Sequence, residues 1–177
     1  MHRIIRAADL QPRPWPNGLG ITRDIAAQEA GAENPGWLIT VADLAGDAAF
    51  SHFPRTDRIF TLLGGAGVTL ELDGHPPLPC LPWVPASFPG DVPTFCRMAG
   101  GAARAFNVMT GRGHEARVAV RSIAAGHTVR STPRCTAIFC AEGSLTVGNE
   151  RLGAGDTMLH PGATAIEGPG LALMVDI

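Results

Sequence analysis

The sequence predicts an all-β protein, and three observations lead to this prediction. Glycine and proline contribute 22 and 15 of the 177 residues and are spread along the chain, so turns are frequent and elements are short. Several short runs alternate apolar and polar residues with the period that marks a half-buried strand. The helical period is nearly absent, and only the alanine-rich stretch 42–49 is expected to form one short helical turn.

The strands are expected to follow one another in short succession. In residues 67–74 (GVTLELDG), for example, Val68, Leu70 and Leu72 share one face, and an Asp-Gly turn ends the strand. The expected strands are 21–28, 37–45, 58–65, 67–74, 105–111, 115–123, 135–143, 156–160 and 171–177.

Two regions repeat one plan. Residues 58–78 read as an apolar strand, a glycine turn, an alternating strand and a second turn. Residues 135–163 follow the same order, with expected turns at Glu142-Gly143 and Gly148-Asn149. Self-similarity of this kind indicates two copies of one β unit.

The second copy resembles the half-motif of cupins, small β-barrels in which a Gly-Asp turn leads into a strand closed by a Pro-Gly turn. Its counterpart in the first copy is Gly90-Asp91. The resemblance implies a bicupin, in which two cupin-like β-barrels of unequal size are fused. We expect residues 1–114 to form the larger barrel, which carries a ligand pocket, and residues 115–177 to form the smaller one.

Composition narrows the function. The N-terminus lacks the apolar region of a signal peptide, no stretch is long enough for a membrane span, and the four cysteines match no zinc or disulfide spacing. We therefore expect buried free thiols and a cytoplasmic protein. The net charge of −2 favours neither nucleic acid nor a membrane as a partner. All 14 basic residues are arginine, which excludes a Schiff-base lysine and a P-loop lysine.

Known catalytic motifs are missing from the chain. The six histidines form no H-x-H pair that would let them converge on a metal, and only His160 lies inside a cupin-like motif. Gly18-x-Gly20 resembles the start of a dinucleotide loop, but a strand follows it where anion binding would need a helix. We expect no metal, no cofactor and no catalytic residue. These features favour a binding protein over an enzyme, and the sequence leaves that choice open.

Polar residues remain at strand and turn positions of the N-terminal two-thirds. Arg58, inside an apolar run, is the strongest candidate to point into a barrel. Such a charge needs either an anionic ligand or an internal ion pair with an aspartate such as Asp57 or Asp91, and the two alternatives are about equal. Asn107 is likewise either a ligand contact or a core amide with internal partners. Asn17-Gly18 alone is typical of a turn.

Four stretches together resemble the HutD/Ves family, small bicupin proteins of bacteria often encoded with histidine-utilisation genes. They are 14–26 (PWPNGLGITRDIA), 37–70, 88–91 (FPGD) and 105–113 (AFNVMTGRG). The resemblance implies a metal-free barrel that senses or buffers an anionic intermediate of histidine breakdown, such as N-formylglutamate. That molecule carries two carboxylates and a formamide, which suit Arg, Asn, Ser and Thr side chains. The ligand-binding positions are expected at Asn17, Thr22, Arg23, Ser51, Phe53, Asp57, Arg58 and Asn107.

Three positions depart from the family pattern. Leu19 interrupts a glycine run, Arg55 stands where glycine usually follows Phe-Pro, and Ala105 replaces an acidic residue. We expect Leu19 to narrow the pocket and Arg55 to add a positive charge at its mouth.

Two other functions stay open. One is a cupin enzyme that acts on a small carboxylate, either as an isomerase or hydrolase with His52 or His114 as base, or as an atypical metal-dependent oxygenase. The other is a barrel used for protein contact or as a homodimer, through the arginine-rich residues 97–134. That run contains seven arginines, but it is more typical of a solvated strand face.

Overall fold

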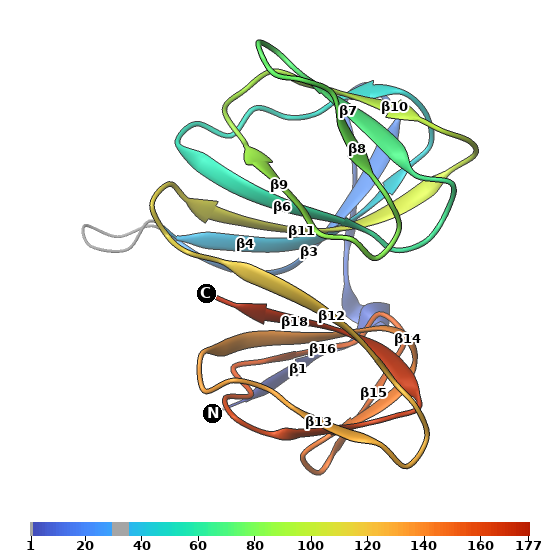
Figure 1. The fold of residues 1–177 in the computed structure, drawn as a ribbon, viewed down its shortest axis with the longest axis vertical. Coiled ribbons are helices and arrows are strands. Elements are labelled where there is room, and N and C mark those ends of the chain that lie inside the picture. The colour runs from blue at the N-terminus through green and yellow to red at the C-terminus, as the bar shows by residue number, and fades with distance from the viewer. Residues whose placement is uncertain (1, 30–35) are drawn as a thin grey trace. The chain divides into compact units, whose positions relative to one another are not determined.

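The computed structural model describes residues 2–29 and 36–177, and Figure 1 shows their strands. The all-β prediction is confirmed, because apart from the three-residue 3-10 helix η1 (Ala7–Asp9) the regular elements of the described residues are strands. Met1 and residues 30–35, which the expected larger barrel includes, lie outside the described part. The chain divides into two compact units, Gln11–His114 on one side and Glu115–Ile177 with the segment that ends at Leu10 on the other.

The helical turn expected within 42–49 does not form. This stretch instead ends β4 (Trp37–Leu44) and contains β5 (Ala48–Ala49), because its alanines pair with neighbouring strands. None of the helical segments in the described residues has the length and apolar character needed to cross a membrane.

The unit of residues 11–114 is built from two antiparallel sheets. The six-stranded sheet has the order β2-β3-β4-β11-β6-β9, and the four-stranded sheet has the order β5-β10-β7-β8. The strands not yet given are β2 (Pro12–Pro14), β3 (Gly20–Gln28), β6 (Thr56–Leu62), β7 (Val68–Leu72), β8 (Leu78–Cys80), β9 (Ala86–Pro89), β10 (Thr94–Met98) and β11 (Ala103–Gly111).

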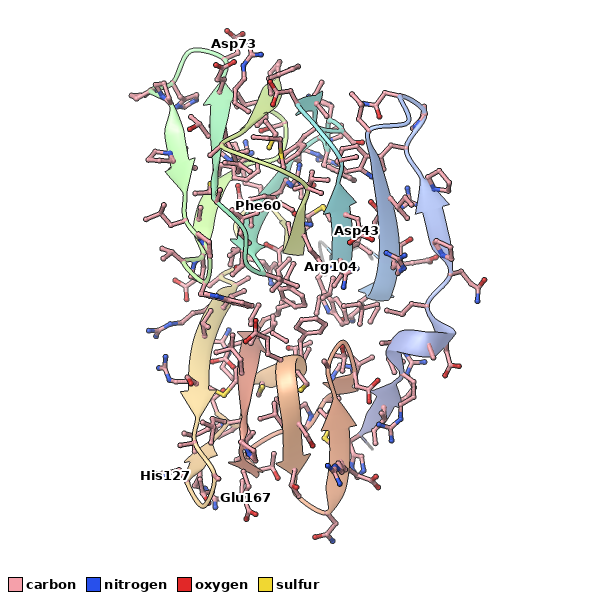
Figure 2. All side chains as sticks on the ribbon, turned by 90° about the vertical axis from the view of Figure 1, so that its right-hand side faces the viewer. Asp43, Phe60, Asp73, Arg104, His127 and Glu167 are labelled. Carbon is pink, nitrogen blue, oxygen red and sulfur yellow. The ribbon has the colours of Figure 1, made fainter. Side chains whose placement is uncertain are left out.

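The core of this unit joins its two sheets. Phe60 and Leu62 of β6 belong to the same buried cluster as Leu70 of β7 and Cys96 of β10. Figure 2 shows Phe60 in the interior of the unit. Alternate residues of β7 are buried in this cluster, which is the origin of the sequence pattern that predicted the strand.

Strand register brings a few polar side chains to the inner face of the six-stranded sheet. Thr40 of β4 lies opposite Asn107 of β11, and Asn107 lies opposite Phe60 of β6. Two residues further along, Met109 lies opposite Arg58. Because successive side chains point to opposite faces of a strand, Arg58 shares its face with the buried Phe60, and Asn107 shares its face with Met109.

The other unit pairs the first strand of the chain with strands of the C-terminal third. Its eight-stranded sheet has the order β1-β16-β14-β17-β13, with β12 on β18 and both β15 and β18 on β14. Residues 1–10 were expected in the larger barrel, but β1 pairs with β16. The strands are β1 (Arg3–Ile5), β12 (Arg117–Ile123), β13 (Thr128–Arg130), β14 (Cys135–Val147), β15 (Glu150–Gly153), β16 (Thr157–Leu159), β17 (Ala165–Glu167) and β18 (Gly170–Asp176).

Two turns expected in this unit have different outcomes. Gly148 and Asn149 join β14 to β15, as expected. The Glu142-Gly143 turn does not form, because β14 continues through it with an irregular register. Gly143 has a φ of 72°, and a Cβ atom there would lie 2.8 Å from the Pro169 carbonyl oxygen. Glycine here allows a close approach of two strands within a bulge, not a chain reversal.

All four cysteines are buried free thiols, as the sequence predicts. Burial raises their pKa, to about 11 for Cys80 and Cys140 and to about 12 for Cys96 and Cys135. Nucleophilic cysteine chemistry requires a thiolate, so these four residues pack as small apolar side chains.

Candidate ligand pocket

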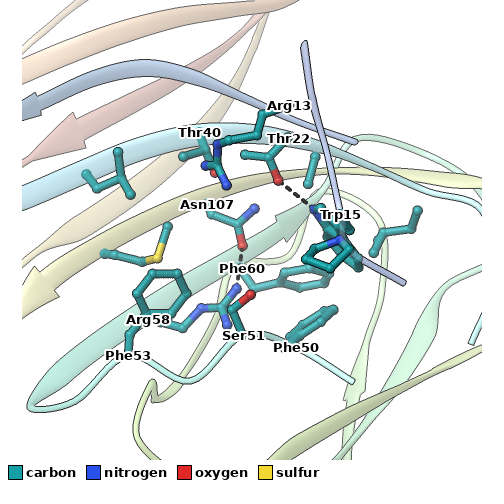
Figure 3. Close-up of a pocket in the computed structure, with 15 residues that line it drawn as sticks. Arg13, Trp15, Thr22, Thr40, Phe50, Ser51, Phe53, Arg58, Phe60 and Asn107 are labelled. Atoms are coloured by element: carbon teal, nitrogen blue, oxygen red, sulfur yellow. Dashed lines mark hydrogen bonds between the residues drawn. The ribbon is translucent and has the colours of Figure 1, made fainter. Parts of the chain in front are cut away.

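A cavity of about 150 Å³ lies within the unit of residues 11–114, and Figure 3 shows its lining. We call it the pocket. Sites for drug-sized ligands have about 300–1,000 Å³, so this one suits a small metabolite. The pocket is lined by Arg13, Trp15, Pro16, Thr22, Leu38, Thr40, Ala42, Leu44, Phe50, Ser51, Phe53, Arg58, Phe60, Asn107 and Met109.

Arg58 is the charged group most deeply placed in the pocket. The residue is 7% exposed, and its Nη2 donates a hydrogen bond of 3.2 Å to Asn107 Oδ1. Its Nε is buried without a hydrogen-bond partner in the described residues. Burial lowers the pKa of Arg58 to about 10, so the guanidinium still carries its charge at neutral pH.

Phenylalanine rings surround this guanidinium. Its carbon Cζ lies 5.0 Å from the ring centre of Phe50, 5.5 Å from that of Phe53 and 5.1 Å from that of Phe88. Rings at such distances attract a cation through their quadrupoles, but they do not neutralise it. They also keep water away, which strengthens any interaction that Arg58 makes with an anion.

The aspartates considered as internal partners of Arg58 are paired with another arginine. Arg112 contacts Asp91 through Nη2 at 2.6 Å and Asp57 through Nε at 3.4 Å. Hydrogen bonding to Arg112 lowers the pKa of Asp91. No salt bridge of Arg58 is found within the described residues, so the internal ion-pair alternative is not observed.

Gly90 makes room for the aliphatic part of Arg58. A Cβ atom at Gly90 would lie 3.2 Å from Arg58 Cγ, 3.3 Å from its Cδ and 3.1 Å from the Thr56 carbonyl oxygen. The backbone N–H of Gly90 donates to that same oxygen at 2.7 Å, and its carbonyl accepts from Phe53 N–H. Glycine at this position therefore lets the loop after β9 pack directly on Arg58.

Hydroxyl and amide groups complete the polar side of the pocket. Asn107 and Thr40 are buried, and they lie opposite each other on β11 and β4. The Thr22 hydroxyl accepts a hydrogen bond of 2.8 Å from Trp15 Nε1 and keeps its own proton for donation. Ser51 is exposed and lies near Arg58 in Figure 3.

Five of the eight residues expected at the site line the pocket, and three do not. The five are Thr22, Ser51, Phe53, Arg58 and Asn107. Arg23 and Asp57 are each next to a lining residue in a strand and therefore point to the opposite face. Arg23 Nη1 binds Asp43 at 2.6 Å, and Asp43 also accepts from Arg104, which lies beside it in Figure 2. Asn17 Oδ1 accepts from Leu19 N–H, so Asn17 shapes the turn.

The three positions that depart from the family pattern also lie outside the pocket lining. Leu19 is 37% exposed and does not narrow the pocket, and Arg55 does not contribute a charge to it. Arg55 has a φ of 52°, a conformation that favours glycine, which explains the usual family residue. Ala105 is fully buried in the core.

Sequence reasoning missed Arg13 and the full role of Trp15. Arg13 lies in β2, a strand too short and too rich in proline for its alternation to be recognised. Trp15 stacks so closely on Gly20 that a Cβ atom there would lie 2.7 Å from the indole ring. The sequence did contain a signal for this packing: a glycine five residues after a tryptophan, since only glycine permits the contact between Trp15 and Gly20.

Neither histidine considered as a base lines the pocket. His52 Nε2 lies 2.9 Å from the Asp91 carbonyl oxygen, and His114 N–H donates to the Gly111 carbonyl. In the part of the chain that the structure describes, no three His, Cys, Asp or Glu side chains are grouped so as to hold a metal ion.

Comparison with known proteins agrees with the sequence resemblance. Residues 7–173 match the family model described as HutD. A relative described as an uncharacterized 21.2 kDa protein in the hutC 3' region of Pseudomonas putida is 37% identical over 108 residues, 60% of this chain and 57% of the relative. Protein Ves of Cronobacter sakazakii is 33% identical over 116 residues, 63% of this chain and 64% of the relative. The chain thus spans less than two thirds of the length of either curated relative.

A solved structure extends the likeness over the whole fold. HutD from Pseudomonas fluorescens SBW25, described for a formate condition, is 25% identical, with a TM-score of 0.81 over 99% of this chain and 98% of that chain. The predicted bicupin fold is confirmed, because the solved structures that share it are bicupins. With a family model that matches nearly all of its length, this chain belongs to the HutD family.

Proposed function

We propose that the barrel of residues 11–114 binds a small carboxylate and that Arg58 holds its negative charge. The ligand class that fits best is an anionic intermediate of histidine breakdown such as N-formylglutamate, which the protein senses or buffers. One observation carries the proposal. Arg58 is charged, buried and without a carboxylate partner in the described residues, and it lies at the wall of the pocket.

An unpaired buried charge such as that of Arg58 is costly to the fold. A charge removed from water destabilises a fold unless an opposite charge and hydrogen bonds compensate it. Asn107 offers Arg58 one neutral oxygen, and Arg58 Nε has no acceptor in the described residues. A carboxylate binds guanidinium through two parallel hydrogen bonds and would supply both the charge and the missing acceptor.

The remaining lining groups suit the rest of such a ligand. Asn107 presents an N–H₂ group that can donate to a carbonyl oxygen, and Ser51, Thr22 and Thr40 offer hydroxyls. A formamide needs one donor and one acceptor of this kind. The apolar side chains Leu38 and Met109 line the same pocket and suit a short aliphatic chain.

The family supports the same ligand class. The Pseudomonas fluorescens HutD structure is described for a formate condition, and formate is the smallest carboxylate. The Pseudomonas putida relative is described by a position next to a hut gene. Both facts favour a small acid connected with histidine utilisation.

Calorimetric titration tests the proposal. N-formylglutamate, glutamate, urocanate and histidine are titrated into the wild type and into Arg58→Met, whose fold is checked by circular dichroism. We expect one of the acids to bind saturably to the wild type and not to the folded variant. Absence of binding of all four at millimolar concentration, or equal binding to Arg58→Met, would contradict the proposal.

A further inference from the structure

We propose that Arg13 determines specificity for dicarboxylates: it binds the second carboxylate of a ligand whose first carboxylate is held by Arg58, and Asp24 competes for it. This inference rests on the proposed function. It adds a residue that belongs to neither the sequence motifs nor the expected site.

The backbone places Arg13 at the pocket. Arg13 is the central residue of β2 and lies opposite Thr22 of β3, another lining residue. In Figure 3 the guanidinium of Arg13 points into the pocket, with Asn107 between it and the guanidinium of Arg58. The pocket therefore has an arginine on either side of a central amide.

The two arginines differ in a way that suits a molecule with two charged ends. Arg58 is buried and uncompensated, so it attracts any carboxylate small enough to enter. Arg13 has a side chain that is 64% exposed, and it is already paired. A monocarboxylate satisfies Arg58 alone, whereas a dicarboxylate that spans the pocket also reaches Arg13.

Asp24 competes with a ligand carboxylate for Arg13. Both of its carboxylate oxygens accept from one atom of Arg13, Nη2, at 3.0 and 3.3 Å. A guanidinium has five N–H donors, so this pair leaves the other two nitrogens of Arg13 for a ligand. With both side chains about half exposed or more, the pair is weak and a ligand carboxylate can exchange for Asp24.

Matched ligands separate the roles of the two arginines. N-formylglutamate is compared by calorimetry with each of its two monoamides, which keep its size and lose one charge. We expect the wild type to bind the diacid more tightly than either amide. In Arg13→Gln, the diacid should bind about tenfold more weakly than it binds to the wild type. One of the two amides should then bind as tightly as the diacid, because the carboxylate that it lacks no longer has a partner.

Two further variants complete the experiment. Asp24→Asn removes the competitor and should tighten diacid binding about two- to fivefold, with no change for the amide that cannot reach Arg13. Arg104→Gln is the matched control. It removes the same charge from an exposed arginine that does not line the pocket, and it should leave all affinities unchanged.

The outcomes distinguish this inference from the proposed function. The inference is wrong if the affinity difference between the diacid and each amide is the same in Arg13→Gln as in the wild type, or if Arg104→Gln has the same effect as Arg13→Gln. In either case the proposal that Arg58 binds a carboxylate still stands. If no ligand binds the wild type, both the inference and the proposed function are wrong. A loss confined to Arg13→Gln, together with a gain in Asp24→Asn, supports the inference.

Discussion

Replacing Arg58 by methionine is expected to stabilise the ligand-free protein while abolishing carboxylate binding. Methionine keeps an unbranched chain of similar length among Phe50, Phe53 and Phe88, and it removes the charge. Buried ion-pairing groups are often more favourable when replaced by apolar side chains of similar volume. An arginine kept at a cost to stability is a sign that it serves binding.

The size of the stabilisation expected for Arg58→Met follows from the lowered pKa of Arg58. The fall in the Arg58 pKa from the ordinary arginine value to about 10 corresponds to a destabilisation of about 3 kcal/mol. Loss of the three ring contacts and of the hydrogen bond to Asn107 together offsets about 2 kcal/mol of the gain. The net increase in the free energy of unfolding is therefore about 1 kcal/mol, or about 2–4 °C in Tm for a chain of this length.

Urea denaturation and calorimetry in a buffer free of carboxylates and phosphate measure this difference. The folded state releases the Arg58 proton more readily than the unfolded state, so the wild type is penalised at all pH values below about 10. The penalty fades as the pH rises above about 10 toward the ordinary pKa of arginine, and the difference in stability between variant and wild type should narrow there. A folded Arg58→Met that is less stable than the wild type at pH 7 would refute the reasoning.

Three other substitutions have defined outcomes. Arg55→Gly should raise the free energy of unfolding by about 0.5–1 kcal/mol in urea denaturation, because Arg55 has a φ of 52° that glycine adopts without strain; no change would argue against strain. Asp43→Asn should lower the free energy of unfolding by about 1 kcal/mol or less at pH 7. Burial alone would raise the pKa of Asp43, but hydrogen bonds from Arg104 and Arg23 lower it, so the carboxylate stabilises the fold while it is ionised. This cost should vanish as the pH falls below about 4, since a carboxylate with a lowered pKa stabilises only while ionised, and a cost that persists at pH 2 would contradict the ion-pair explanation. Gly90→Ala should weaken carboxylate binding in calorimetric titration, since its methyl group would push on Arg58; unchanged affinity would show that the loop yields freely.

Periodicity made much of the fold predictable, and its limits are physical. Strands such as β7 and β12 are long enough for their sequences to show alternation, and they were predicted. β5 has two residues and β8 has three, so no pattern can develop in them, and their pairing is decided by the neighbouring strands. The Glu142-Gly143 turn was predicted from a dipeptide that is equally typical of a bulge, and only the partner strand decides between the two.

The candidate site shows the same division. Arg58 was recognisable as a charge inside an apolar run, and alternation alone would have removed Asp57, its immediate neighbour, from the lining. Thr40 reaches the pocket through its register with Asn107, which sequence does not reveal without knowledge of the pairing. Arg13 could not be predicted because β2 contains only three residues, two of them proline.

The prolines on either side of Arg13 also affect whether a strand of another protein chain can pair with this edge of the sheet. β2 is the edge strand of its sheet, and the N–H of Trp15 donates to Gly20 of β3, so Arg13 and Trp15 direct their backbone groups inward. Pro12 and Pro14 therefore face the open edge, where they offer no N–H to a further strand. The short strand that borders the pocket thus also blocks edge-to-edge pairing, a common route to aggregation of β proteins.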